Sequence, residues 1–346
     1  MKRIIFIVIL LLSLNVFASS TIVMDTNTGR ILYQSNAYEK RLIASTTKIM
    51  TFVVAYEYGK DFLDLEIEAG NEILKMYGTS IYISLHEKMT LRDLLYGLML
   101  RSGNDAAVVI ANFIGGNEEN FVKLMNKKAQ FIGMNNTIFS NPHGLDEETK
   151  NYSTAYDMAK LSIYANKIPF YREVTSTKYY NVKTNIKSYS WINRNKLAFI
   201  YPNYISGKTG YTPKAGKTFV STASKNKLEL TIVSLNDNDY YSNHQSLYNE
   251  MFNKYQNYLL LSKDEFNQKY DNYYIKRDIY YPLTNDEIDN VDIRLIANNN
   301  SDFEKIIISL FGKDVYEEVV YKKNKLIVNT NESLWKKMSN FFYKIF

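Results

Sequence analysis

Ser45 and Lys48 are the two residues of this chain whose types and spacing first suggest covalent chemistry. Residues three positions apart on a helix share a face. The apolar residues that follow, Ile49, Phe52 and Val53, must be buried. We therefore expect the lysine amine at the edge of the core, where burial lowers its pKa. A neutral lysine amine can take the proton from a serine hydroxyl and turn the serine into a nucleophile.

This spacing is weak support when it stands alone. The same Ser-x-x-Lys pattern occurs at Ser224 and Lys227 and again at Ser333 and Lys336. A solvated helix face or a turn explains most such matches. The pattern at Ser224 falls between two expected strands, which indicates a hairpin turn. Whether Ser45 and Lys48 are catalytic therefore has to be judged from the other polar stretches of the chain.

Two such stretches could complete a site. Ser102-Gly103-Asn104 lies between apolar helical patterns at 90–100 and 105–111, so a loop would project Ser102 and Asn104 into a cleft. A plain helix–helix connector with a glycine turn explains the same residues. Lys208-Thr209-Gly210 occurs once and is expected on a strand, where the glycine lets a substrate approach the backbone. The alternative interpretation of Lys208-Thr209-Gly210 is an ordinary exposed strand end.

The elements that would position these residues follow from hydrophobic periodicity and turn residues. A hairpin is expected ahead of the Ser45 helix, and two strands around a turn are expected after the Lys208 stretch. Thr90 is expected to cap the helix at 90–100, and Ser153 or Thr154 is a good cap for the helix that follows. In chain order, the expected elements are strands at 21–25 and 30–33, a helix at 45–58, a short strand at 81–85, helices at 90–100, from 105 and from 154, and strands at 217–223 and 228–235.

Composition limits the class of protein. With 346 residues, 46% of them hydrophobic and 14% aromatic, the chain can form a large and a small packed domain. It has no cysteine, which excludes disulfides, thiol catalysis and thiolate metal sites. His86, His143 and His244 lack metal-ligand spacing, so no metal and no other cofactor is expected. His143 is interpreted as a packed loop residue. The net charge of +6 suits an anionic cell envelope and indicates no nucleic-acid partner.

Both ends of the chain carry targeting patterns. Residues 1–18 have a basic start, a short apolar run and small residues before Ser19, as in a secretory signal peptide; an uncleaved anchor is the alternative. We expect an exported protein at the outer face of the cytoplasmic membrane. Residues 332–346 form an amphipathic helical pattern with Trp335 and Phe341 on its apolar face. This pattern favours peripheral binding to a membrane surface over docking on the protein's own core.

Taken in order, the three motifs are specific. Ser45-Thr46-Thr47-Lys48, Ser102-Gly103-Asn104 and Lys208-Thr209-Gly210 correspond to the S-x-x-K, S-D-N and K-T-G signature of penicillin-binding proteins and class A β-lactamases. With flanking words such as Asn141-Pro142-His143-Gly144, the region from Thr21 to Leu235 resembles the low-molecular-mass D-alanyl-D-alanine carboxypeptidases, serine peptidase family S11.

The resemblance implies an α/β (α+β) fold. A β-lactamase/transpeptidase-like domain, with an antiparallel sheet flanked by helices, is expected at 19–262. A small β-rich domain is expected at 263–331, where the composition shifts toward Asn, Asp, Lys and Tyr. The partners that it implies are peptidoglycan stem peptides ending in D-Ala-D-Ala, and β-lactam antibiotics as covalent inhibitors.

The resemblance also implies roles for the catalytic residues. Ser45 would attack the carbonyl of the penultimate D-alanine, form an acyl-enzyme and release the terminal D-alanine. Lys48 would be the base for that attack, kept neutral by burial and by a nearby lysine. Ser102 would relay the proton to the leaving amine. Asn104 would hold the substrate amide and Lys48.

The remaining motif residues would bind the substrate. Lys208 would supply positive charge for the terminal carboxylate, and Thr209 would hydrogen-bond the same group. Gly210 would let the substrate approach the strand. The backbone N–H groups of Ser45 and Tyr211 would form the oxyanion hole.

Other functions fit parts of this pattern. A class A β-lactamase adds a glutamate that activates the deacylating water, and we find no convincing glutamate loop between Gly116 and Tyr204. A D,D-endopeptidase that cuts peptide cross-links could use the same residues with a different pocket rim. A non-catalytic peptidoglycan-binding protein would be expected to lack Ser45, Lys48 or Lys208, and all three are present.

Overall fold

The computed structural model describes residues 19–297 and 302–323. The chain divides into two compact units: unit 1 runs to Asn257 and takes in Pro282–Thr284, and unit 2 comprises Tyr258–Tyr281 and the residues from Asn285 on. The expected signal at 1–18 and the expected terminal helix at 332–346 lie outside the described residues. Within the part of the chain that is described, no helix combines the length and apolar character needed to cross a membrane.

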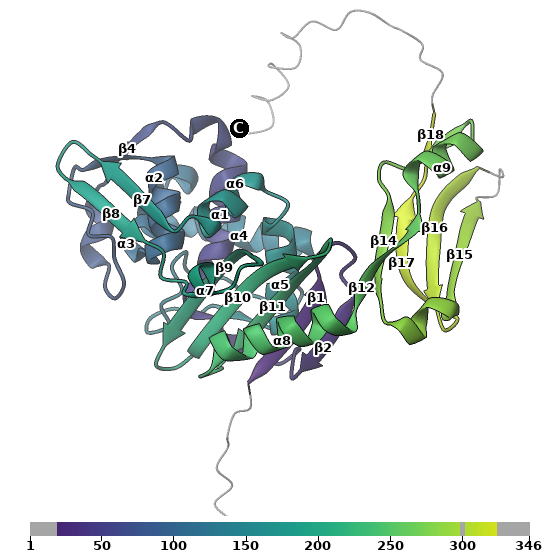
Figure 1. Ribbon diagram of the computed structural model, residues 1–346. Coiled ribbons are helices and arrows are strands. Elements are labelled where there is room, and N and C mark those ends of the chain that lie inside the picture. The colour runs from purple at the N-terminus through teal and green to yellow at the C-terminus, as the bar shows by residue number, and fades with distance from the viewer. Residues whose placement is uncertain (1–18, 298–301, 324–346) are drawn as a thin grey trace, which may run out of the picture. The chain divides into compact units, whose positions relative to one another are not determined.

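A five-stranded antiparallel sheet forms the centre of unit 1, in the order β2-β1-β11-β10-β9 (Figure 1). The N-terminal hairpin joins the sheet through β1, which pairs with β11 so that Ser20 lies opposite Leu235. The expected hairpin and the expected strands around the turn at 224–227 are confirmed. The strands are β1 (Ser20–Asp25), β2 (Ile31–Ser35), β9 (Tyr204–Thr212), β10 (Gly216–Lys225) and β11 (Leu228–Leu235).

The expected helices are confirmed, with the caps that the sequence indicates. The hydroxyl of Thr90 accepts a hydrogen bond from Asp93 N, and that of Thr154 accepts one from Asp157 N, so each caps the helix that follows. The helices of unit 1 are α1 (Lys48–Gly59), α2 (Leu91–Tyr96), α3 (Asn104–Gly115), α4 (Glu118–Ile132), α5 (Ala155–Ala165), α6 (Pro169–Ser176), α7 (Leu197–Ile200) and α8 (Tyr240–Lys254), with 3-10 turns at Ala44–Thr47, Lys60–Phe62 and Asn71–Lys75 and a π-helical turn at Gly97–Arg101.

Apolar side chains cover both faces of the central sheet. Successive residues of a strand point to opposite faces, and β11 shows the consequence. Leu230 and Ile232 pack with residues of α8, whereas Val233 and Leu235 pack with residues of α1 and α5. The sheet is therefore enclosed between α7 and α8 on one face and helices that include α1 and α5 on the other, and Figure 1 shows α8 lying along the sheet.

Short antiparallel pairs complete unit 1. The hairpin β7/β8 follows α6 and carries residues that reach the loop before α2. The pairs are β3 (Arg41–Leu42) with β6 (Tyr152–Ser153), β4 (Glu66–Glu68) with β5 (Lys88–Thr90), and β7 (Tyr179–Lys183) with β8 (Ser188–Ile192).

The expected strand at 81–85 is wrong. This segment pairs with no other strand of the described residues, and Tyr82 has a left-handed backbone with φ of 64°. Buried Ile81 and Ile83 alternate with exposed Tyr82 as they would in a strand. The backbone N–H groups of both isoleucines, however, donate to the carboxylate of Asp105 at 3.0 Å. A side chain of α3 thus takes the donors that a neighbouring strand would otherwise satisfy.

Unit 2 is rich in β-strands, as expected. Its three-stranded antiparallel sheet has the order β15-β16-β17, and Ile306 and Ile308 of β16 pack against Phe266 and Ile275 in its core. The remaining elements are β12 (Gln256–Leu261), α9 (Lys263–Lys269), β13 (Tyr273–Tyr274), β14 (Ile279–Leu283), a 3-10 turn (Asn285–Asn290), β15 (Val291–Ala297), β16 (Phe303–Leu310), β17 (Lys313–Val319) and β18 (Tyr321–Lys322).

Candidate active site

Ser45 lies in the 3-10 turn that leads into α1, and Lys48 is the first residue of that helix. Their side chains meet, with Lys48 Nζ 3.1 Å from Ser45 Oγ. Two glycines hold the turn. A Cβ on Gly144 would lie 2.0 Å from the Ala44 carbonyl oxygen, and a Cβ on Gly210 would lie 2.8 Å from Ser45 N. The close approach of these two backbones fixes the position of the serine.

Lys48 is fully buried and has two further contacts. Its Nζ lies 2.7 Å from Asn104 Oδ1 and 2.5 Å from the carbonyl oxygen of His143. Burial, and after it the positive charge of Lys208, hold the pKa of Lys48 well below its usual 10.5. A neutral amine has two N–H bonds and one lone pair. Because the two carbonyl oxygens can only accept, they take the N–H bonds, and the lone pair is left for the hydroxyl proton of Ser45.

Ser102 follows the π-helical turn and has a left-handed backbone with φ of 64°. Such a conformation is uncommon for a residue with a side chain and tends to occur at functional sites. Ser102 Oγ lies 3.0 Å from Lys208 Nζ. Gly103 has no room for a side chain, because its Cβ would lie 2.9 Å from Asp105 Oδ1. Ser102 and Lys208 form a second hydroxyl–amine pair beside Ser45 and Lys48.

The amide of Asn104 is fixed in one orientation. Its Nδ2 donates to the carbonyl of Tyr77 at 2.7 Å, and its backbone N–H donates to the carbonyl of Thr79 at 2.8 Å. This leaves Oδ1 as the atom that faces Lys48. The orientation of Asn104 therefore depends on the loop at 77–84, which is neither helix nor strand.

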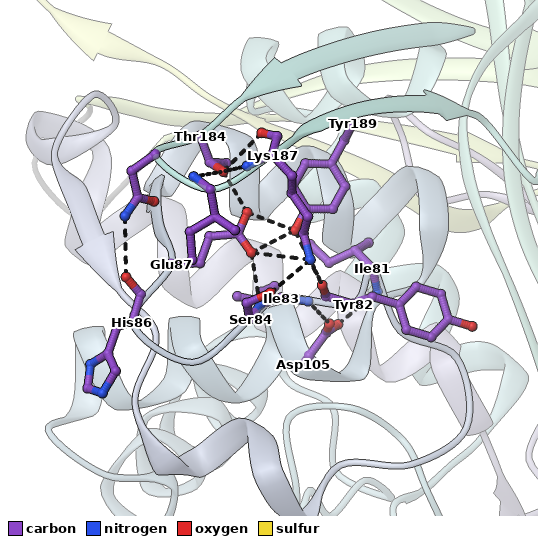
Figure 2. A network of polar contacts seen from close by, with 12 residues as sticks. Ile81, Tyr82, Ile83, Ser84, His86, Glu87, Asp105, Thr184, Lys187 and Tyr189 are labelled. Atoms are coloured by element: carbon purple, nitrogen blue, oxygen red, sulfur yellow. Dashed lines mark hydrogen bonds and ion pairs between the residues drawn. The ribbon is translucent and has the colours of Figure 1, made fainter.

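Asp105 anchors that loop from the start of α3 (Figure 2). Its carboxylate accepts hydrogen bonds from the hydroxyl of Ser80 and from the backbone N–H groups of Ile81 and Ile83. The carboxylate is buried, and a buried carboxylate with several donors is a strong anchor. Asp105 thus holds the loop whose carbonyl groups orient its neighbour Asn104.

Glu87 is the second anchor, and it ties the same loop to the β7/β8 hairpin (Figure 2). This fully buried carboxylate accepts from Ser84 N at 2.8 Å, from the Thr184 hydroxyl at 2.6 Å and from the Tyr189 hydroxyl at 2.9 Å, and Lys187 Nζ lies 3.5 Å away. Burial alone would raise the pKa of Glu87, but these donors outweigh burial and the pKa is lowered. No local pattern predicts this contact, because Glu87 and Tyr189 are 102 residues apart.

The Lys208 stretch lies on β9, the edge strand of the central sheet, as expected for a strand. Lys208 is 2% exposed, and its Nζ also donates to the carbonyl of Thr209 at 2.7 Å. Burial, and after it the charge of Arg194, lower the pKa of Lys208 to about 7. The side chain of Tyr211 is 63% exposed. An edge strand has backbone groups that a peptide can pair with by adding a strand.

A cavity of about 370 Å³ opens at these residues. Lys48, Asn104 and Lys208 are buried and do not line it. Two cations that the sequence analysis did not single out, Arg194 and Lys217, do line it, because nothing in their local sequence distinguishes them from other surface cations. The lining comprises Ser45, Thr79, Ser102, Arg194, Thr209, Gly210, Tyr211, Lys217 and Tyr240.

The other candidates from the sequence lie apart from this site. Ser224 is the penultimate residue of β10, and Lys227 lies in the turn between β10 and β11, as expected for a hairpin. The third Ser-x-x-Lys pattern lies outside the described residues. The ring of His143 is buried, and burial followed by the charge of Lys48 lowers its pKa to about 3. His143 therefore contributes its backbone carbonyl oxygen to the site, as an acceptor for Lys48 Nζ, and not its ring. Within 19–297 and 302–323, no group of three His, Asp or Glu side chains could hold a metal ion.

The sequence model of the D-alanyl-D-alanine carboxypeptidase family, peptidase S11, matches residues 11–239. The chain belongs to this family. The D-alanyl-D-alanine carboxypeptidase DacF of Bacillus subtilis (strain 168) is 37% identical over 220 residues, which cover 62% of this chain and 56% of DacF. DacA of Escherichia coli (strain K12) is 34% identical over 230 residues, which cover 62% of this chain and 54% of DacA. The chain spans about half the length of these curated relatives.

Two solved structures share the fold. Penicillin binding protein 5 from Haemophilus influenzae has a TM-score of 0.74 at 25% identity, covering 88% of this chain and 96% of its own. The D-alanyl-D-alanine carboxypeptidase DacD from Francisella tularensis has a TM-score of 0.69 at 25% identity, covering 88% and 92%. These likenesses confirm the expected fold class, with an antiparallel sheet flanked by helices and a β-rich C-terminal region.

Proposed function

We propose that this member of the S11 family is a serine-type D-alanyl-D-alanine carboxypeptidase that removes the terminal D-alanine from peptidoglycan stem pentapeptides. The observation that carries the proposal is the set of contacts around Lys48, where two acceptor-only oxygens and the Ser45 hydroxyl surround a buried amine. A neutral base within hydrogen-bond reach of a hydroxyl is what activates a serine nucleophile.

Acylation begins when Lys48 Nζ takes the hydroxyl proton of Ser45 and Ser45 Oγ attacks the carbonyl carbon of the penultimate D-alanine. Negative charge then develops on the carbonyl oxygen, and we assign its stabilisation to the backbone N–H groups of Ser45 and Tyr211. The closeness of Gly210 to Ser45 N supports this assignment, because it brings β9 against the serine turn. Loss of one such donor typically costs about a hundredfold or more in rate.

The peptide C–N bond breaks next, and the leaving amine takes a proton relayed through Ser102. The contact of Ser102 Oγ with Lys208 Nζ at 3.0 Å supports this relay. Asn104 keeps Lys48 in place and holds the substrate amide. Thr209 hydrogen-bonds the terminal carboxylate from the cavity wall, and Lys208 contributes positive charge from behind it. Water then hydrolyses the ester and frees Ser45.

β-Lactam antibiotics should acylate Ser45, because their strained amide imitates the D-Ala-D-Ala peptide. The lining of the cavity at Ser45 contains no aspartate or glutamate in the described residues. A class A β-lactamase uses a glutamate to activate the deacylating water, so this lining favours the carboxypeptidase over the β-lactamase.

D-Alanine release from a peptide ending in Lys-D-Ala-D-Ala tests the proposal. The full chain should release D-alanine, and a Ser45→Ala variant should not. A fluorescent penicillin should label the full chain covalently and should not label the Ser45→Ala variant. If the unchanged protein released no D-alanine but still bound penicillin covalently at Ser45, the proposed carboxypeptidase activity would be refuted. The assignment of Ser45 as the nucleophile would still stand.

We also propose that the protein is exported and bound peripherally at the outer face of the cytoplasmic membrane. The proposal is based on the composition of 1–18 and 332–346. A chain that lacks 332–346 should leave the membrane fraction on cell fractionation, whereas the full chain should stay there. Retention of the shortened chain would contradict the role of this segment.

A further inference from the structure

Tyr82 has an uncommon backbone conformation. Its φ of 64° is left-handed, which costs free energy for a residue with a side chain and is rare for a bulky one. Phe311 is also aromatic and has a positive φ, but it lies with Gly312 in the two-residue turn between β16 and β17. Hairpin turns of this length favour positive φ angles. Tyr82 lies in the loop at 77–84, so hairpin geometry does not explain its conformation.

Hydrogen bonds on all sides hold the backbone of Tyr82 in this conformation. The backbone N–H groups of the residues before and after it both donate to Asp105 at 3.0 Å. Its own N–H donates to Ser80 Oγ at 2.9 Å, and its carbonyl accepts from Lys187 Nζ. Figure 2 shows these groups converging on the Tyr82 segment. A strained conformation persists where the surrounding structure over-determines it.

The ring of Tyr82 has no structural role that would explain this strain. Its exposed fraction is 75%, the largest of any Phe, Tyr or Trp among the described residues. Within 19–297 and 302–323, its hydroxyl has no hydrogen-bond partner and its ring stacks on no other ring. The ring points away from the polar network that holds its backbone (Figure 2). A strained residue whose side chain is left free is a candidate for contact with a ligand.

The ring lies beside the active site and outside its cavity. Thr79, in the same loop, lines the cavity at Ser45 together with Arg194, whose Nη1 donates to Thr79 Oγ1 at 3.3 Å. Burial and then the charge of Arg194 lower the pKa of Arg101, and the phenol of Tyr82 acts in the opposite sense, so these three side chains are neighbours. Tyr82 does not line the cavity. A bound substrate would therefore meet the ring with a part that extends beyond the cavity rim.

We propose that Tyr82 packs against a sugar ring of the glycan strand that carries the stem peptide, and that the protein therefore prefers glycan-linked pentapeptides to free ones. The inference rests on the proposed function, because it concerns the substrate of the same site. The cavity of about 370 Å³ is at the small end of ligand sites, so it takes the D-alanyl end and leaves the sugar outside. A sugar ring has a face of C–H groups that can pack on an aromatic face. Its hydroxyls can bond the phenol of Tyr82 and the guanidinium of Arg101.

The experiment measures D-alanine release by the full chain from a free pentapeptide and from the same pentapeptide linked to a disaccharide of the glycan. Tyr82→Ala removes the ring and keeps the Cβ, so the backbone should keep its conformation. It should lower kcat/KM for the linked substrate about fivefold more than for the free one, and should leave penicillin labelling of Ser45 unchanged. Tyr179→Ala is the matched control, since Tyr179 is 66% exposed but lies on a regular strand, β7. It should leave the ratio of the two kcat/KM values unchanged.

The midpoint of urea unfolding tests the strain separately. Tyr82→Gly removes the ring and the strain together, so it should lose the same preference and raise the midpoint by about 0.3 M. Tyr82→Ala should leave the midpoint unchanged, because it removes a ring without structural contacts. A midpoint lowered by Tyr82→Ala would show that the ring stabilises the fold, and would overturn the inference.

The kinetic outcomes separate this inference from the proposed function. If Tyr82→Ala lowered kcat/KM equally for the two substrates, the ring would contact the peptide and not the sugar, and the inference would be overturned. If Tyr82→Ala changed neither value, the ring would have no role in substrate binding, and the carboxypeptidase would still stand. If the unchanged protein released D-alanine from neither substrate, the proposed function would be refuted and the inference with it.

Discussion

Replacement of Gly144 by alanine should slow the acylation of Ser45 by about a hundredfold. The added Cβ would lie 2.0 Å from the Ala44 carbonyl oxygen and 3.0 Å from Ser45 N. Real Cβ atoms essentially never approach closer than 3.0 Å, so the serine turn or the Gly144 segment must move by about 1 Å, the difference between 3.0 Å and 2.0 Å. A displacement of about 1 Å at a reacting group can cost about a hundredfold in rate.

The assay is the second-order rate constant for labelling by a fluorescent penicillin, measured beside the free energy of unfolding in urea. Gly116→Ala is the matched control, because Gly116 also has a positive φ, +73°, but a Cβ there meets nothing within 4 Å. Both variants should lose about 1 kcal/mol of unfolding free energy from the left-handed backbone, and Gly144→Ala should lose more. Acylation by Gly144→Ala within about threefold of the unchanged protein would refute the reasoning.

Further predictions concern Asn104, Glu87 and the buried histidines. Asn104→Ala removes one acceptor of Lys48 and should lower D-alanine release about a hundredfold; unaltered release would show that other groups orient the amine. Glu87→Ala leaves buried donors without their acceptor and should cost about 3 kcal/mol in urea unfolding, and an unchanged midpoint would contradict this. Burial lowers the pKa of His244 to about 3, and burial followed by the charge of Lys48 does the same for His143. Unfolding raises both pKa values to about 6.5, so the unfolded chain binds more protons below that pH. As the pH is lowered from about 6.5 to about 5, the free energy of unfolding should therefore decrease by up to about 1.4 kcal/mol per pH unit for each ring. A free energy of unfolding that stays constant over this pH range would contradict the prediction.

The parts of the site that could be predicted from the sequence are those that depend on short spacing. Ser45 and Lys48 lie within one helical turn, so their separation in the chain largely fixes the distance between their side chains. The caps at Thr90 and Thr154 and the N-terminal hairpin are local in the same sense. The chemistry of Ser45 and Lys48 was expected from the residues themselves, whereas the roles given to Ser102, Asn104, Lys208, Thr209 and Tyr211 came from a resemblance.

The contacts that could not be predicted join distant segments. Asn104 is 56 residues from Lys48, and the second acceptor of Lys48 is a backbone carbonyl 95 residues away. A carbonyl oxygen belongs to every residue, so the sequence carries no mark of its use at His143. The segment 81–85 has the alternation of a strand, but Asp105 satisfies its backbone donors, and only the folded chain brings that carboxylate there.

The pH dependence of Ser45 acylation tests most directly the claim that Lys48 is a neutral base. The measurement is the second-order rate constant for penicillin labelling across the pH range. Because burial holds the pKa of Lys48 well below 10.5, the rate constant should stop rising well before that pH, and Lys48→Ala should abolish labelling at neutral pH. A rate constant that keeps rising about tenfold per pH unit up to about pH 10 would mean that the amine keeps its ordinary pKa, and would contradict the account.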